Sequence, residues 1–133
     1  MLIMIINLIL ATILGGVIGL ERQRHNSQAG IRTFALISLG SCLAMIISQN
    51  LFMGDPGRIA AQVLSGIGFL GAGLIIKNKD SIFGLTTAAT IWVSAVIGLC
   101  IGAELYLIGI FSTSIILFLL WYCEQFKNNQ DGK

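Results

Sequence analysis

Five long apolar stretches, separated by short polar connections, account for most of the chain. Each is close to the ~20 residues that a helix needs to cross ~30 Å of hydrocarbon. They predict five transmembrane helices, at about residues 2–20, 33–52, 59–76, 85–103 and 105–122. The predicted fold class is therefore an all-α integral membrane protein, with a single transmembrane domain over residues 1–123 and a short polar cytoplasmic tail at 124–133.

Composition strengthens this prediction. Hydrophobic residues make up 56% of the sequence and charged residues only 11%, whereas soluble proteins carry about 25% charged residues. The first stretch could be mistaken for a secretory signal peptide, but such a peptide begins with basic residues. Here no basic residue precedes the apolar run, so we expect the first span to be retained.

The basic residues predict how the helices are oriented. Seven of the eight fall on one side of the predicted membrane, and only Arg58 falls on the other. Cytoplasmic segments of membrane proteins carry the excess of Lys and Arg. We therefore expect the N-terminus outside and the C-terminus in the cytoplasm, as an odd number of spans requires. The seven residues on the cytoplasmic side are Arg22, Arg24, Arg32, Lys77, Lys79, Lys127 and Lys133.

Glycine is unusually frequent inside the apolar stretches. Residues 65–73 hold four glycines in nine positions. Their letters match the G-x-G-x-x-G dinucleotide fingerprint, but that motif must follow a strand and open a helix, so we expect no nucleotide site here. Small residues allow close approach of membrane helices, and Gly15-x-x-x-Gly19 is a further example of this pattern. The glycines predicted to serve helix packing are Gly66, Gly68, Gly71, Gly73, Gly84, Gly98 and Gly102.

Two polar stripes run along the third and fourth spans. Asp55 precedes Pro56 and is predicted to cap the third helix; Arg58, Gln62 and Ser65 then follow at steps of four and three on one helix face. The fourth span carries a face of hydroxyls and glycines with the same spacing, which must face protein. Two interpretations are open: helix capping and close packing, or a polar cavity where the stripes meet. The cavity would be lined by Asp55, Arg58, Gln62, Ser65, Thr86, Thr87 and Thr90.

A third group of polar residues lies at the cytoplasmic end of the first span. Acidic and basic side chains alternate there, which is typical of a solvated or lipid-facing cluster. They are also close enough in sequence to form one ion-paired platform on which a partner could dock. The cluster comprises Glu21, Arg22, Arg32 and Thr33.

Catalytic and metal chemistry are not expected. The single histidine, His25, has no second ligand near it in the sequence, and the three cysteines are widely separated. No nucleophile, base and orienting group can be assembled from them. All six carboxylates fall at span ends or in loops, whereas proton relays usually place ionisable groups within the membrane. We therefore predict no enzyme activity, no metal site and no cofactor.

Five segments of the sequence form a recognisable set of motifs: Gly19-Leu-Glu-Arg22, Ala29-Gly-Ile-Arg-Thr33, Asp55-Pro-Gly-Arg-Ile-Ala-Ala-Gln62, Ser65-Gly-Ile-Gly-Phe-Leu-Gly-Ala-Gly73 and Gly84-Leu-Thr-Thr-Ala-Ala89 through Trp92. In order and spacing they resemble the transmembrane domain of the MgtC/SapB family. The resemblance covers roughly residues 15–102, and longer members of that family carry a soluble C-terminal domain after the fifth span. Ten residues follow Cys123 in this sequence.

The resemblance implies a multi-pass protein of the bacterial inner membrane. Members of the family are linked to growth under magnesium limitation and to survival inside host phagocytes, and are regarded as modulators of membrane energetics or ion homeostasis. The partners it implies are the lipid bilayer and a membrane complex such as ATP synthase; a homo-oligomer is a further expectation, and nucleic acid is not expected. The alternative function is a channel or carrier for a cation or small solute, through a polar path between spans three and four.

Overall fold

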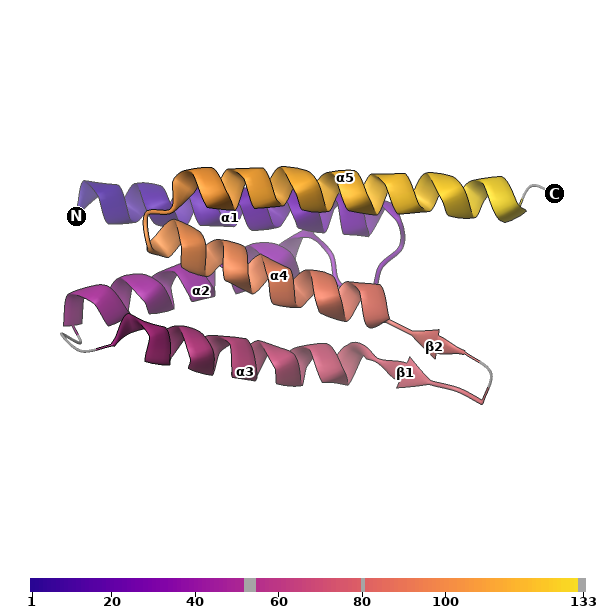
Figure 1. Cartoon of the computed structure of the whole chain (residues 1–133), viewed down its shortest axis with the longest axis horizontal. Helices are drawn as coiled ribbons and strands as arrows, with labels where there is room; N and C mark the ends of the chain where they lie inside the picture. The colour runs from indigo at the N-terminus through magenta and orange to yellow at the C-terminus, as the bar shows by residue number, and fades with distance from the viewer. Residues whose placement is uncertain (52–54, 80, 132–133) are drawn as a thin grey trace.

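The computed structural model of the chain describes residues 1–51, 55–79 and 81–131. Within these ranges it contains five helices long and apolar enough to span a membrane, as the hydropathy pattern predicts. The N- and C-termini lie at opposite ends of the helical bundle (Figure 1). The helices are α1 (Leu2–Arg24), α2 (Ile31–Leu51), α3 (Pro56–Leu74), α4 (Leu85–Gly102) and α5 (Tyr106–Asp131).

The helices differ in how deeply the chain buries them. In the span of α4, 61% of residues are buried, against 39% in α2, 33% in α1, 17% in α5 and 6% in α3. Helices α1, α2 and α4 pack against one another, while α3 lies along one side of the bundle and α5 along the opposite side (Figure 1). The molecule is thus a three-helix core, α1, α2 and α4, with a peripheral helix on each flank.

Glycines bring the three core helices into close contact. A Cβ atom added at Gly15 of α1 would lie only 2.6 Å from the carbonyl oxygen of Phe34 in α2. On the other side of α2, a Cβ at Gly102 of α4 would lie 2.7 Å from the carbonyl oxygen of Cys42. Because real Cβ atoms do not approach so closely, only glycine fits at these points, and the backbone of α2 is held between α1 and α4.

The apolar interior fills the space around these contacts. Its largest fully buried apolar side chains come from all three core helices, and polar side chains are buried among them. The buried hydrophobic cluster comprises Ala11, Ile18, Ala29, Phe34, Cys42, Ile46, Ile91, Ile97 and Ile101.

A small β-hairpin, which the sequence analysis did not predict, joins α3 to α4. The third span was expected to run to residue 76, but α3 ends at Leu74 and Ile75 is already extended. β1 (Ile76–Lys77) pairs antiparallel with β2 (Ile82–Phe83). Gly84 then turns the chain into α4 with a φ of 82°, a left-handed conformation that favours glycine. The two strands extend beyond the ends of α3 and α4 that they join (Figure 1).

The predicted tail is also helical over its described part, since α5 continues to Asp131. The end of α1, the hairpin and the end of α5 all lie at one end of the bundle, and the start of α3 lies at the other (Figure 1). The structure therefore keeps Arg22, Arg24 and Lys77 on the opposite side from Arg58. Which of the two ends faces the cytoplasm stays a prediction of the charge bias.

Candidate functional site

The polar stripe of the third span lies on the surface of the bundle. Asp55 caps α3 as expected: the backbone N–H of Gly57 donates a hydrogen bond to its Oδ1 at 2.9 Å, and Pro56 occupies the first turn. Arg58, Gln62 and Ser65 follow on one helix face, and all three are exposed. In a membrane-spanning helix this exposure means that polar side chains are directed toward lipid or toward another protein.

The opposite face of α3 contacts the bundle. A Cβ added at the buried Gly71 would lie 3.6 Å from Ala88 of α4, an ordinary packing distance. Val63 and Ile67 are partly buried on this side. At 100° per residue, Arg58, Gln62 and Ser65 fall on the side of the helix that points away from Gly71. The stripe is therefore turned outward, away from α4.

The hydroxyls of the fourth span have other partners. Thr87 is buried and its Oγ1 lies 2.8 Å from the Oγ of Ser27 in the α1–α2 connection. Thr90 is buried and donates to the carbonyl oxygen of Thr86 at 2.6 Å, while Thr86 is exposed. Ser94 donates to the carbonyl oxygen of Phe34 in α2 at 3.4 Å. This face of α4 is engaged within its own helix, with α2 and with the α1–α2 connection.

Among the described residues, the two stripes therefore do not meet within the chain, and these contacts favour capping and close packing over a polar cavity between spans three and four. The physical reason is the rotation of α3, which uses its apolar and glycine face to pack on α4. The groove that remains between these helices has a volume of about 300 Å³ and a largely apolar lining of small residues and large side chains, including Gly68, Ala72, Ala89 and Trp92.

Apart from Gly71, which packs on Ala88, the glycines predicted to serve packing divide into two groups. Gly98 and Gly102 lie against α2, where an added Cβ at Gly98 would overlap the carbonyl oxygen of Ser38, and Gly84 similarly approaches the carbonyl oxygen of Leu74. By contrast, a Cβ added at Gly66, Gly68 or Gly73 would meet no described atom within 4 Å.

Large and small side chains alternate on this outward face of α3. Phe69 is 83% exposed, the largest exposed fraction of any large hydrophobic side chain in the interior of a described helix. Ser65, Gly68 and Ala72 surround it at helical spacing, and all three are exposed. Gly68 and Ala72 form the edge of this face, next to the groove between α3 and α4 that they also line. We call the surface formed by Arg58, Gln62, Ser65, Gly68, Phe69 and Ala72 the α3 outer face.

The cluster at the end of α1 is only partly assembled. Arg22 is buried and binds Glu21 through two hydrogen bonds, from Nε at 2.5 Å and Nη2 at 2.7 Å. The Nε2 atom of His25 lies 3.6 Å from the same carboxylate. Arg32 and Thr33 lie exposed on the first turn of α2. The buried pairing of Arg22 with Glu21 orders the end of α1.

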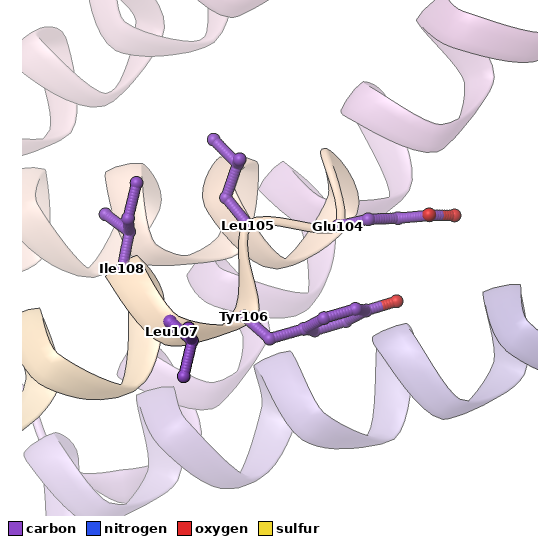
Figure 2. Close-up of a pocket in the computed structure, with 5 residues that line it drawn as sticks. All are labelled: Glu104, Leu105, Tyr106, Leu107 and Ile108. Atoms are coloured by element: carbon purple, nitrogen blue, oxygen red, sulfur yellow. The ribbon is translucent and has the colours of Figure 1, made fainter.

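A polar contact that the sequence analysis missed joins α5 to α1. Tyr106 donates a hydrogen bond to Oδ1 of Asn7 at 2.9 Å, and Asn7 is only 1% exposed. Figure 2 shows the side chains of Tyr106 and Glu104 extending from the α4–α5 corner in the same direction, next to an open cavity of about 350 Å³. An asparagine inside an apolar span was the signal available in the sequence, because such a side chain requires a partner.

The side chains that could bind a metal ion lie apart from one another in the described residues. Over residues 1–51, 55–79 and 81–131, no three His, Cys, Asp or Glu side chains come close enough together to hold a metal ion. Cys42 is buried in the three-helix core, and Cys123 is exposed on α5. The α3 outer face remains the surface whose chemistry is least explained by contacts within the chain.

Comparison with known proteins identifies relatives of this chain. The model of the MgtC family matches residues 8–129. The protein named "Putative magnesium transporter YhiD" of Escherichia coli K12 is 49% identical over 125 residues, covering 87% of this chain and 58% of that protein. Protein MgtC of Salmonella typhimurium LT2 is 46% identical over 113 residues, covering 85% of this chain and 49% of the relative.

These relatives are longer than the sequence described here, which spans about half of their length. An uncharacterized protein of Haemophilus influenzae shows the same relation, at 44% identity over 53% of its length. No solved structure matches the chain significantly. Five apolar helices, the motifs along them and a family match over nearly the whole sequence lead to one conclusion: the chain is a multi-pass membrane protein that belongs to the MgtC family.

Proposed function

We propose that this protein serves magnesium homeostasis as a regulator in the bacterial inner membrane, acting through protein contacts made by the α3 outer face. The names of its relatives, one of them a putative magnesium transporter, support the link to magnesium. The excess of basic residues at one end supports a cytoplasmic C-terminus and an outer N-terminus.

The observation that carries this proposal is the exposure of Gln62 on a membrane-spanning helix. Gln62 lies ~6 Å along the helix from Arg58, at 1.5 Å per residue. A polar group that faces hydrocarbon without a hydrogen-bond partner costs several kcal/mol. A protein partner would supply those hydrogen bonds, and the neighbouring glycines would let its backbone approach closely.

The alternative, a channel or carrier within one chain, has less support. It would need a polar path through the bundle. The space between α1, α2 and α4 is filled by contacts between glycines and backbone, and the groove between α3 and α4 has a largely apolar lining. A regulatory role uses the polar residues where they lie, on the outside of the bundle.

The family resemblance suggests a membrane complex such as ATP synthase as one partner of the protein, and survival inside phagocytes as one setting in which it matters. Both belong to the proposal. What the α3 outer face supports directly is a narrower statement: the protein works by contact with a second membrane-embedded surface.

A growth assay tests the proposal. In a strain that depends on this protein in low magnesium, Gln62→Leu should reach the membrane in normal amount but fail to restore growth, because the amide that binds the partner is gone. Ser114→Leu is the matched control. Ser114 is also exposed on a spanning helix, but its hydroxyl donates to the carbonyl oxygen of Ile110 in its own helix. Full growth with Gln62→Leu would contradict the proposal.

A further inference from the structure

We propose that the partner bound by the α3 outer face is a second copy of this chain, so that the protein forms a two-fold dimer with the two α3 helices side by side. This inference rests on the proposed function, since it names the occupant of the same surface. It follows from the hydrogen bonding, the shape and the charge at this end and face of α3, because in each respect the surface complements a second copy of itself.

Membrane insertion restricts the symmetry. Two copies inserted in the same orientation can be related by a two-fold axis only if that axis runs along the membrane normal. The two α3 helices are then parallel, and every residue meets its counterpart at the same depth. In such an interface residue i contacts residue j and j contacts i, so the surface must complement itself in shape, hydrogen bonding and charge.

Hydrogen bonding is the first property. The amide of Gln62 carries both donors and an acceptor. At an interface on the two-fold axis, Gln62 would face Gln62 of the partner subunit, and each amide can donate to the other. This pairing satisfies both polar groups without any other protein, and a polar residue in this role is known to specify association between helices.

Shape is the second property. Phe69 projects from a face on which its neighbours have small side chains. Counted from Phe69 as residue i, Ser65, Gly68 and Ala72 occupy positions i−4, i−1 and i+3. These three residues and Phe69 itself mark the corners of a hole of the kind that receives a knob from a parallel helix. Each copy therefore offers one knob and one hole. The open space above Gly68, with no described atom within 4 Å of an added Cβ, is where the ring of the partner's Phe69 would fit.

Charge is the third property. Asp55 and Arg58 are both exposed at the start of α3, about one helical turn apart. In a parallel dimer the carboxylate of Asp55 comes near Arg58 of the partner subunit, and the reverse contact forms by symmetry. Opposite charges on each copy thus offset the repulsion that two facing arginines would otherwise produce.

The outer face of α5 provides a contrast within the same molecule. It is also exposed, but it presents large apolar side chains such as Leu107, Phe111 and Phe118, which are 74%, 67% and 58% exposed. The hydroxyls of Thr113 and Ser114 on that helix donate to its own carbonyl oxygens. A surface of this kind suits lipid chains, so exposure alone does not distinguish α3; the combination of polar and small residues does.

Photo-crosslinking in native membranes tests the inference. Phe69 is replaced by p-benzoylphenylalanine, which reacts with any neighbour, in cells that express two differently tagged copies of the chain. The same replacement at Phe111 on α5 is the matched control, because both rings are exposed on spanning helices. We expect a covalent product containing both tags from position 69 and its absence from position 111. Adding Gly68→Leu, which fills the hole, should remove that product.

The other outcomes distinguish this inference from the proposed function. A product at position 69 that joins one copy to a different protein would overturn the dimer but support the proposed function. Lipid adducts alone at position 69, as expected at position 111, would overturn both. Equal yields of the two-tag product from both positions would show random collision in the membrane and would also overturn the dimer.

Discussion

Two glycine-rich regions of this protein have the same sequence signature and opposite surroundings. Gly98 and Gly102 of α4 lie directly against the backbone of α2, and so do Gly15 and Gly19 of α1. The glycines of α3 are denser in sequence, yet three of its four central ones face open space. The comparison teaches that small residues mark a helix interface without telling whether the partner helix belongs to the same chain.

The difference has a consequence for how the two regions respond to substitution. We expect the glycines that lie directly against the backbone of α2 to be required for the chain to fold, and the outward glycines of α3 to be required for what the folded chain contacts. Stability and function should therefore separate between the two regions. Substitutions at three glycines, taken from the largest expected effect on stability to the smallest, test that separation.

Gly98→Leu should have the largest effect on stability. Even the first side-chain atom at this position would overlap the carbonyl oxygen of Ser38, and it would lie 2.9 Å from Cβ of Ser41. Since backbone must move to make room, we expect a loss of ~3 kcal/mol in the free energy of unfolding. Denaturant titration in mild detergent measures it. Gly40→Leu on α2, where an added Cβ meets no described atom within 4 Å, should change little.

Gly71→Leu should have an intermediate effect. Gly71 is the buried glycine of α3, and an added Cβ would lie 3.6 Å from Ala88. That distance accepts a methyl group but not a longer side chain, so we expect Gly71→Ala to be nearly neutral and Gly71→Leu to cost ~1–2 kcal/mol. The same titration compares them. Equal stability of the two variants would mean that α3 does not pack on α4 as described.

Gly73→Ala should have the smallest effect on stability. Its added Cβ would meet no described atom within 4 Å, and surface substitutions without such contacts usually change stability by less than ~0.5 kcal/mol. Thermal unfolding in detergent measures the difference from the unmodified chain. A larger loss would place Gly73 at a contact inside the bundle and would weaken the contrast between α3 and α4.

The sequence predicts the five spans well because hydropathy and length are enough to identify a transmembrane helix. It also predicts that the Ser94, Gly98 and Gly102 face of α4 must contact protein. The outward rotation of α3 could not be predicted in the same way. Its polar and glycine faces are both plausible contact surfaces, and the choice depends on Ala88 of α4, a residue far away in sequence.

Two further features lay beyond the sequence analysis for different reasons. The hairpin at residues 76–83 carries a signal, since Lys77-Asn-Lys-Asp80 reads as a turn between apolar pairs, but the apolar run of the third span obscured its start. The bond between Tyr106 and Asn7 joins residues that lie 99 positions apart in the sequence. Asn7 indicates that a partner must exist, but only the packing of α5 against α1 identifies it.

Gly68→Leu provides the most direct test of the central claim, that the α3 outer face contacts a partner outside the chain. The measurement pairs the amount of folded protein in the membrane with growth in low magnesium. We predict a normal amount of folded protein, because the Cβ atom of the added side chain meets no described atom of its own chain within 4 Å. We also predict loss of growth, because the side chain fills the space that the partner occupies. Loss of the folded protein, or normal amount with full growth, would contradict the account.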